Sequence, residues 1–447
     1  MRNRLLFTGA RLVSVTDESV GIIDDSWLLC EDGVIADSGT GWAPDPGPAT
    51  RRVDLGGAFL APGFVSSHSH LFTSVARGLG SGETLHGWAD EMHAVTGGAS
   101  SDDVYWATMH GAFDNLANGI TTVFDFIDSR TPRVPIRDDA DADAPTMRPL
   151  AYVDRQIDAH VDAGIRAVVA VTIEGGGDGG PQAWRDFAHA VEHARASDPR
   201  FILDAAVSGA AQRAQDDRFA AVEAEAMRRF GIVNQVHLLE TLERLEAQRE
   251  TFWWYERAGA LGPGMIFGHF VHPDESIVSA VAAAGCAVSW QPVADGRLAS
   301  GTADIPSLTS RGIRVGLGLG DQACSDVSDP WQSMRFALYQ SRAASGTTAL
   351  SPADVLRMQT IGAAEVIGQS GSVGSTMPGA YADLLVVDPR RPDMGPLRAP
   401  LVSYVLSSTL RNLREVYVGG ELASVAGVAR SPLAERASAE VHRRFAV

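Results

Sequence analysis

Short apolar runs alternate with helix-like segments through the middle of the chain. Each run is six to eight residues long and rich in Val, Ile, Phe and Ala, which is typical of buried parallel strands. Between the runs, apolar positions recur three and four residues apart, which indicates amphipathic helices. Together with a run at 60–67, the strand candidates number eight: 121–126, 166–173, 201–207, 233–238, 265–270, 287–292 and 313–320. This alternation predicts the α/β class and a (β/α)8 barrel, whose active site lies where the strands end.

The two ends of the chain have a different pattern. Residues 1–60 consist of short strand candidates separated by Gly and Asp, and strand-like alternation returns at 377–388 and 413–422. We therefore expect residues 1–60 and 372–447 to form one small composite β domain, a β-sandwich. The barrel, over 61–371, would be inserted between its two parts. The stretch 128–149, rich in Asp, Pro and Arg, predicts a surface loop.

Composition excludes several classes of partner. The 447 residues include 37 Lys and Arg against 55 Asp and Glu, a net charge of −18 that would repel a nucleic-acid backbone. No uninterrupted apolar run approaches the ~20 residues that a membrane span requires. The cysteines number three and are widely spaced, which favours free thiols in a reducing cytoplasm over a disulfide framework. We expect a cytoplasmic protein that acts on small molecules.

Two histidines end the first barrel strand. On an extended strand, residues two apart point to the same face, so His68 and His70 would project together at the strand's C-terminal end. Two convergent imidazoles suit a single zinc or iron ion. Taken alone, the pair is also compatible with surface or hydrogen-bonded histidines.

Further polar residues follow other strands. His237 and Glu240 follow the fifth strand, His269 the sixth and Asp321 the eighth. Each has an alternative explanation, such as a hydrogen bond within the protein or, for Asp321, a helix cap. All of them at the mouth of one barrel predict a functional site.

Several stretches, in the same order along nearly the whole chain, resemble the amidohydrolase superfamily. The similarity is to its branch of cytosine and guanine deaminases, adenosyl-homocysteine deaminases and triazine hydrolases. The matching stretches are Pro62–His70, Ala76–Leu79, Asn118–Thr122, His237–Thr241, Gly259–His269, Leu298–Gly301 and Pro378–Asp388.

The resemblance implies a mechanism and a residue for each role. One divalent metal ion, zinc or else iron, would be bound by His68, His70, His237 and an aspartate on the eighth strand, and would activate a water molecule. Glu240 would protonate a ring nitrogen of the substrate as general acid and base. His269 would orient the water or polarise the developing oxyanion. The resemblance also implies a homodimer or a larger homo-oligomer.

The eighth strand departs from the family pattern. A gap-free comparison places Gly320, and not Asp321, at the position of the metal-binding aspartate. A slip of one residue would turn Asp321 away from the metal unless the strand end is irregular. Glycines at 316, 318 and 320 are compatible with such irregularity. Asp321 is thus expected as ligand or proton shuttle, with an impaired centre at Gly320 as the alternative.

The residues expected to contact substrate also differ from relatives. Trp290 and Gln291 stand where relatives carry a histidine at the end of the seventh strand. The indole of Trp290 could stack on a planar ring or fill space. In the segment after His70, the residues Arg77, His86 and Trp88 could line the pocket.

These observations predict a metal-dependent hydrolase that cleaves a carbon–nitrogen bond, other than a peptide bond, in a small nitrogen heterocycle. Hydrolytic deamination is the first expectation. Alternatives within enzymes are a different leaving group, such as halide or a substituted amine, and ring opening of a cyclic amide. The alternative of another class is a binding protein that keeps the fold but has lost hydrolysis, because Gly320 occupies the ligand position.

Overall fold

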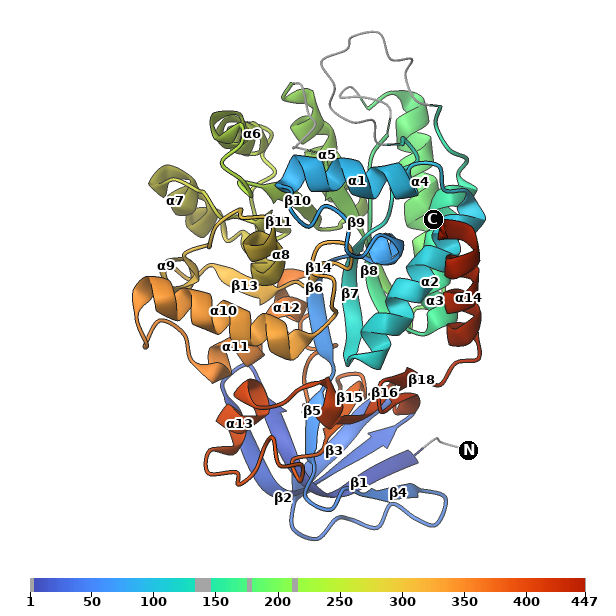
Figure 1. The fold of residues 1–447 in the computed structure, drawn as a ribbon, viewed down its shortest axis with the longest axis vertical. Coiled ribbons are helices and arrows are strands. Elements are labelled where there is room, and N and C mark those ends of the chain that lie inside the picture. The colour runs from blue at the N-terminus through green and yellow to red at the C-terminus, as the bar shows by residue number, and fades with distance from the viewer. Residues whose placement is uncertain (1–3, 133–145, 175–178, 211–215, 447) are drawn as a thin grey trace.

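The computed structural model describes residues 4–132, 146–174, 179–210 and 216–446. One of its two nine-stranded sheets is built from parallel strands, β6 to β13 in sequence order with β14 beside β6, which confirms the predicted barrel (Figure 1). The strands are β6 (Phe64–His70), β7 (Ile120–Phe126), β8 (Arg166–Val171), β9 (Ile202–Gly209), β10 (Asn234–Leu238), β11 (Met265–His269), β12 (Ala287–Trp290), β13 (Arg314–Leu317) and β14 (Gly320–Asp321). Part of the predicted surface loop, residues 133–145, lies outside the described residues.

The eighth strand of the barrel is broken into two pieces. β13 pairs with β12, whereas the short β14 pairs with β6, so that Asp321 lies beside His70. Between the two pieces, the backbone N–H of Leu319 donates to the Ser66 hydroxyl at 3.0 Å. This break closes the ring against the strand that carries His68 and His70.

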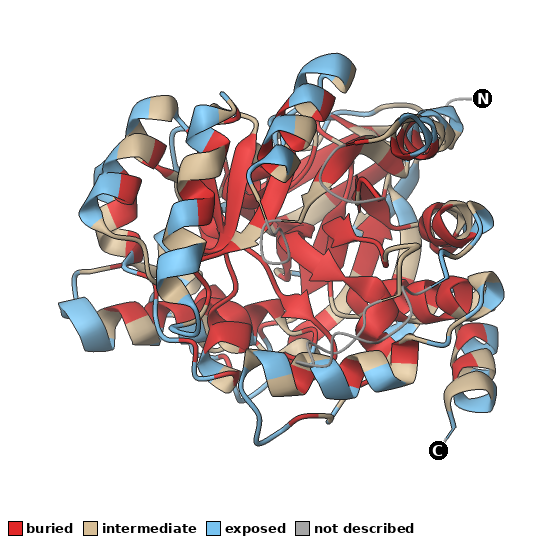
Figure 2. Ribbon diagram, turned by 90° about the horizontal axis from the view of Figure 1, so that it is seen from above, coloured by how far each residue is buried: buried red, intermediate tan, exposed pale blue. Residues whose placement is uncertain are grey.

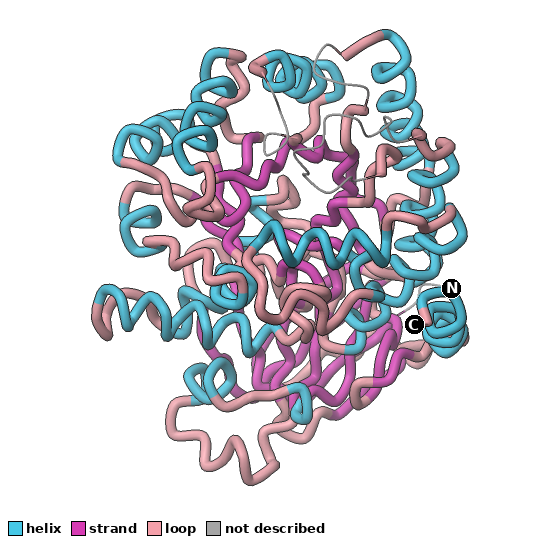
Figure 3. Tube along the Cα trace, turned by 45° about the horizontal axis from the view of Figure 1, so that its top comes forward, coloured by secondary structure: helices cyan, strands magenta, loops and turns pink. Residues whose placement is uncertain are grey.

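Helices cover the outside of the barrel (Figure 3). Their inward faces are buried and their outward faces exposed, as their amphipathic sequences predict (Figure 2). α7 shows how the sequence sets the ends: the Asp274 side chain accepts from the N–H of Ile277 at the start, and Gly285 ends the helix with φ of 69°. The larger helices are α2 (Ser101–Ala117), α3 (Ala151–Ala163), α4 (Pro181–Ala196), α5 (Arg218–Phe230), α6 (Leu245–Arg257), α7 (Glu275–Ala284) and α10 (Pro330–Ser345).

The remaining described helices are α1, α14 and several shorter ones. α1 (Leu85–Thr96) lies over the end of the barrel where the strands finish, and α14 (Leu433–Phe445) packs beside α2 (Figure 1). The others are η1 (Leu71–Val75), α8 (Pro292–Arg297), α9 (Ile305–Ser310), α11 (Pro352–Met358), α12 (Ile361–Val366), α13 (Pro400–Leu406) and η3 (Leu410–Asn412). No described helix is both long and apolar enough to cross a membrane.

The second sheet joins the two ends of the chain. Its order is β18-β17-β16-β15-β5-β1-β2-β3, with β4 paired to β1. The strands are β1 (Arg4–Val15), β2 (Val20–Glu31), β3 (Val34–Thr40), β4 (Arg51–Asp54), β5 (Phe59–Pro62), β15 (Leu384–Val387), β16 (Leu413–Val418), β17 (Glu421–Val425) and β18 (Val428–Ala429). The domain boundaries at 60 and 372 stay a prediction.

The single strand expected at 60–67 is two strands that belong to different sheets. β5 pairs with β1 and β15 of the second sheet, whereas β6 begins the barrel. The chain changes sheets at Gly63, whose N–H donates to the carbonyl of Asp383 at 2.8 Å. A side chain at position 63 would collide with Thr121. Gly63 therefore permits the close approach that the change of sheet requires.

Candidate metal centre and active site

Three histidines converge at the C-terminal mouth of the barrel. His68 and His70 end β6, and His237 lies on β10, whose end reaches the same mouth. Nε2 of His70 lies 3.2 Å from Nε2 of His68 and 3.1 Å from Nε2 of His237. Ligand nitrogens around a tetrahedral zinc ion are ~3.3 Å apart, from Zn–N bonds of ~2.0–2.1 Å. The three side chains therefore fit a divalent metal ion.

One phenylalanine ring packs against the three imidazoles. The ring of Phe126, at the end of β7, is stacked on His70 with centroids 5.0 Å apart and planes at 17°. The same ring lies 4.7 Å from His68 and 4.6 Å from His237. The ring of Phe126 thus packs against one side of the three-histidine cluster. Sequence reasoning missed it, because a phenylalanine that ends a buried strand carries no chemical signal.

Glu240 and His269 lie beside this cluster. Glu240 is buried, and its Oε1 is 3.6 Å from Nε2 of His269. His269 is held in a left-handed backbone conformation, with φ of 65°, and its N–H donates to Oε1 of Gln291 at 2.8 Å. A left-handed non-glycine residue costs energy, about 1–3 kcal/mol, so the surrounding contacts must hold it in place.

Asp295 is a further member that sequence reasoning missed. Its Oδ1 lies 2.6 Å from Nδ1 of His269, and both side chains are buried. Burial acts to lower the pKa of His269, but the charges of Glu240 and Asp295 outweigh it and raise this pKa to about 9. The imidazole is therefore a cation at neutral pH. Asp295 lies in α8, a short helix after the seventh strand, and no residue spacing in the sequence marked it.

Asp321 is buried at the same mouth, next to His70 across the β14–β6 pair. Burial raises the pKa of Asp321 to about 7, and the charge of Glu240 adds to the rise, although backbone hydrogen bonds from Cys324 and Ala323 oppose it. The Cys324 N–H lies 2.6 Å from Oδ1 of Asp321. The charge of Asp321 in turn raises the pKa of His269, so Asp321 belongs to the electrostatic environment of the site.

A side chain at position 320 would be directed toward α8. A Cβ atom at Gly320 would lie 3.2 Å from Cβ of Ala294, on α8. The backbone of Gly320 has φ of 74°, which L-residues rarely adopt. The strand end is thus irregular, as the three glycines suggested. This geometry favours Asp321 over position 320 as the source of the eighth-strand carboxylate.

The side chains expected to line a substrate pocket are bonded to other parts of the protein. Arg77 pairs with Asp114 of α2 at 2.7 Å. The half-exposed His86 pairs with Glu243 at 3.2 Å. Trp88 is buried, and its indole N–H donates to the carbonyl of Ala323 at 3.1 Å. These contacts favour structural roles rather than direct contact with substrate, and those of His86 and Trp88 hold α1 over the barrel mouth.

Trp290 and Gln291 are also fully buried. Gln291 uses both ends of its amide within the protein: Nε2 donates to the Ser289 hydroxyl at 2.8 Å, and Oε1 accepts from the N–H of His269. Trp290 packs in the hydrophobic core of the barrel. Gln291 is therefore better placed to support His269 than to bind substrate, and Trp290 fills the core of the barrel.

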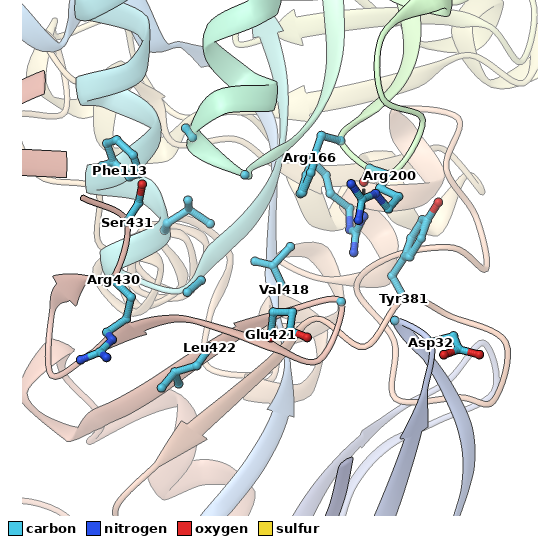
Figure 4. A pocket seen from close by; sticks show the side chains of 17 residues that line it. Asp32, Phe113, Arg166, Arg200, Tyr381, Val418, Glu421, Leu422, Arg430 and Ser431 are labelled. Carbon is cyan, nitrogen blue, oxygen red and sulfur yellow. Dashed lines mark hydrogen bonds between the residues drawn. The ribbon is translucent and has the colours of Figure 1, made fainter. Parts of the chain in front are cut away.

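A separate cavity of about 600 Å³ lies where the barrel strands begin, next to the second sheet (Figure 4). Arg166 lines it together with Arg200 and Tyr381. The guanidinium of Arg166 donates to both carboxylate oxygens of Asp383, at 2.7 and 2.8 Å, and stacks over Tyr381 at 3.7 Å. None of the predicted site residues lines this cavity, so it is distinct from the candidate metal centre.

A (β/α)8 barrel with a histidine cluster, a buried glutamate and a charged histidine at the strand ends defines the class of barrel hydrolases that use a metal ion. The model of the amidohydrolase family matches residues 59–423, more than half of the chain, and the chain belongs to this family.

Relatives of known name cover most of the chain. A 5-methylthioadenosine/S-adenosylhomocysteine deaminase from Symbiobacterium thermophilum is 28% identical over 409 residues, which cover 88% of this chain and 87% of the relative. Two solved structures share the fold. An adenosine deaminase from Xanthomonas campestris with bound zinc has a TM-score of 0.84 at 21% identity, over 98% of this chain and 97% of its own. An atrazine chlorohydrolase from Arthrobacter aurescens, complexed with zinc, has a TM-score of 0.85 at 20% identity, over 99% and 100%.

Proposed function

We propose that this protein catalyses the hydrolytic deamination of an amino-substituted nitrogen heterocycle. The observation that carries the proposal is the position of Glu240 and His269 beside the three-histidine cluster, all at one barrel mouth. The cluster alone would be a metal site. An adjacent buried carboxyl and an imidazolium add the groups that proton transfer and oxyanion stabilisation require.

His68, His70 and His237 would hold the metal ion, and Asp321 is the candidate for a fourth ligand. A divalent ion bound there would act as a Lewis acid and lower the pKa of a water molecule toward ~7. Zinc is our first expectation, because neutral imidazoles suit it and two relatives in fold were solved with zinc. Iron is the alternative, and elemental analysis of protein purified without chelators decides between them.

Each proton of the attacking water has an assigned path. Glu240 takes up one proton of the water and donates it to the ring nitrogen next to the carbon that bears the amino group, and the water oxygen bonds to that carbon. Asp321 accepts the other proton of the water and passes it to the amino group, which leaves as ammonia. The ring carbonyl forms as the ammonia leaves, and both carboxyl groups return to their starting protonation states.

His269 stabilises the oxygen that develops negative charge during this attack. Its side chain is cationic at neutral pH because Glu240 and Asp295 raise its pKa. Nδ1 is engaged by Asp295 at 2.6 Å, which leaves the Nε2 side of the ring facing Glu240. Preorganised donors of this kind contribute strongly to catalysis, because no reorganisation is required when the charge develops.

The names of the relatives support adenosine-type nucleosides as the first substrates to test. Two departures from the family pattern argue for a wider panel. Ala206–Ala211 stands where relatives with purine-type substrates often carry a His-x-Pro-Tyr stretch, and Trp290 and Gln291 stand where relatives usually carry a histidine. A homodimer or larger homo-oligomer and a cytoplasmic location stay predictions. Sedimentation measurements would test the first of these.

The test is a product assay on protein that carries one equivalent of zinc. The panel contains adenosine-type nucleosides, guanine, cytosine, aminopterins and aminotriazines, together with chlorotriazines, alkylaminotriazines and cyclic amides. We expect one ammonia per molecule of product for at least one amino-substituted ring. Release of chloride or alkylamine alone, or ring opening alone, would replace deamination by that chemistry. A zinc-loaded protein that binds these rings without turnover would support the binding-protein alternative.

A further inference from the structure

One buried glutamine contacts a histidine of the cluster. Gln235 lies on β10, two residues before His237, so both side chains point into the barrel. Its Oε1 is 2.6 Å from Nδ1 of His68, and its Nε2 donates to the carbonyl of Ser67 at 2.9 Å. Gln235 therefore connects the fifth barrel strand to the first, immediately before the two ligand histidines.

These two contacts determine the orientation of the amide. A backbone carbonyl can only accept a hydrogen bond, so the amide nitrogen of Gln235 must face Ser67. The amide oxygen must then face His68, where it can only accept. Nδ1 of His68 consequently carries the proton, and Nε2 keeps its lone pair on the side of His70.

The surroundings of His68 leave its ring little freedom to turn. A Cβ atom at Gly268 would lie 3.2 Å from both Cε1 and Nδ1 of His68. At Gly318, it would lie 2.5 Å from Cβ of His68. The absence of a side chain at both glycines, with the ring of Phe126 nearby, leaves a narrow slot for the imidazole.

We propose that Gln235 is a positioning residue, which holds His68 in the tautomer with the proton on Nδ1 and so presents Nε2 to the metal ion. The proposal rests on the metal centre of the proposed function. A histidine ligand needs its second ring nitrogen bonded to an acceptor, and loss of that acceptor typically weakens metal binding 10- to 100-fold. In this chain, the acceptor comes from a glutamine on a different strand.

The chain offers a matched control. Gln359 is also fully buried, and its Nε2 also donates to a carbonyl of β6, that of Val65, at 2.9 Å. Its side chain makes no contact with a histidine of the cluster in the bonds described. Gln359→Met thus removes a buried amide of the same kind from the same strand. The only designed difference from Gln235→Met is the bond to His68.

The experiment measures zinc affinity by competition with a chromophoric chelator, so no substrate is needed. We expect Gln235→Met to bind zinc about 10- to 100-fold more weakly than wild type, and Gln359→Met to differ from it less than about threefold. Gln235→Glu keeps an acceptor at His68, and we expect it to bind zinc more tightly than Gln235→Met. Equal affinities of Gln235→Met and Gln359→Met would overturn the proposal.

The outcomes separate this inference from the proposed function. A wild-type protein that binds no zinc contradicts the metal centre itself, whereas a zinc-binding wild type with an unaffected Gln235→Met contradicts only the role of Gln235. Thermal melting of the metal-free variants shows whether they fold. If Gln235→Met does not, nitrogen-15 NMR of the metal-free wild type decides the question, because a His68 with its proton on Nε2 would rule the proposal out.

Discussion

The two ends of the barrel bury charge in opposite ways. Where the strands begin, Arg166 forms two hydrogen bonds with Asp383, so each charge has its counterpart. Where the strands end, Glu240, Asp295 and Asp321 are buried around one cationic imidazole, that of His269. Burial raises the pKa of Asp321 to about 7, and the charge of Glu240 adds to the rise.

The difference shows what each end is built for. A buried ion pair whose charges neutralise each other can hold two parts of a chain together. Here it joins β8 of the barrel to the residue before β15 of the second sheet. An excess of buried carboxyls is unfavourable for folding and is retained where a metal ion or a reacting group supplies the missing positive charge. The predictions below separate the two ends by their effects on catalysis and on stability.

The largest effect is expected at the catalytic end, for Glu240→Gln. The amide has the same shape but cannot donate and regain a proton, so we expect kcat to fall by a factor of about 10²–10⁴. The melting temperature should fall little, if at all, because the substitution removes one of the excess charges. The measurement is steady-state kinetics beside thermal melting of zinc-loaded protein. A variant that keeps more than a tenth of the wild-type kcat would remove Glu240 from the mechanism.

At the structural end, Asp383→Ala should show the opposite pattern. It leaves the Arg166 guanidinium buried without its counter-ion, which costs about 3–5 kcal/mol of unfolding free energy. The folded fraction should keep the kcat of the wild type, since Arg166 contacts no group of the active site. Denaturant unfolding measures the first quantity and active-site titration the second.

A double variant sharpens this test. Arg166→Met with Asp383→Leu removes both charges and replaces them with apolar side chains of similar size, and it should recover most of the lost stability. If the double variant is as unstable as Asp383→Ala, the unpaired charge does not account for the loss. The hydrogen bond that the Gly419 N–H donates to Asp383 at 2.8 Å, which both variants lack, is then the remaining cause.

An intermediate effect is expected at Gly320. Because its backbone has φ of 74° and its Cβ would face Ala294, Gly320→Asp should lower stability by about 1–2 kcal/mol and leave kcat no higher than wild type. Gly320→Ala, the control, should cost about the same, because the strain comes from the Cβ atom. A gain of orders of magnitude in kcat for Gly320→Asp would instead identify the present chain as an impaired enzyme.

The parts of the site that follow from local alternation were predictable. His68 and His70 share a face because they are two residues apart on one strand, and strand ends gather at one mouth in a parallel barrel. The strands themselves were marked by their apolar runs, with two exceptions. The run at 60–67 is divided between two sheets at Gly63, and the run at 313–320 is broken between β13 and β14. A continuous apolar run cannot show where a chain leaves one sheet for another.

Contacts between distant segments could not be read from the sequence. The bond from Gln235 to His68 depends on the arrangement of strands 167 residues apart, and that from Asp295 to His269 on the path of a short helix. Likewise, Arg77 follows His70 closely in sequence but pairs with Asp114. Residue type and spacing identify candidates for chemistry, whereas their partners depend on the packing of the whole barrel.

The last expected effect is a dependence of stability on pH, at His110, a paired group on α2 outside the three-histidine cluster. Nδ1 of His110 lies 3.1 Å from the Ser74 hydroxyl, within the segment that follows His70. Burial lowers the pKa of His110 to about 4, and the charge of Arg77 adds to this, whereas Asp114 opposes it. The folded protein thus keeps this histidine neutral at pH values where the unfolded chain protonates it.

The sign of the pH effect follows from proton uptake. Between the usual histidine pKa, about 6.5, and the folded value of about 4, the unfolded state binds more protons than the folded state, so stability falls as the pH falls through this range. We expect His110→Gln to reduce the loss between pH 6.5 and 4 by about 1–3 kcal/mol relative to wild type. Urea unfolding at a series of pH values measures both slopes. Parallel slopes would mean that His110 stays exposed enough to protonate in the folded protein, and that other groups at this end of the barrel account for its response to acid.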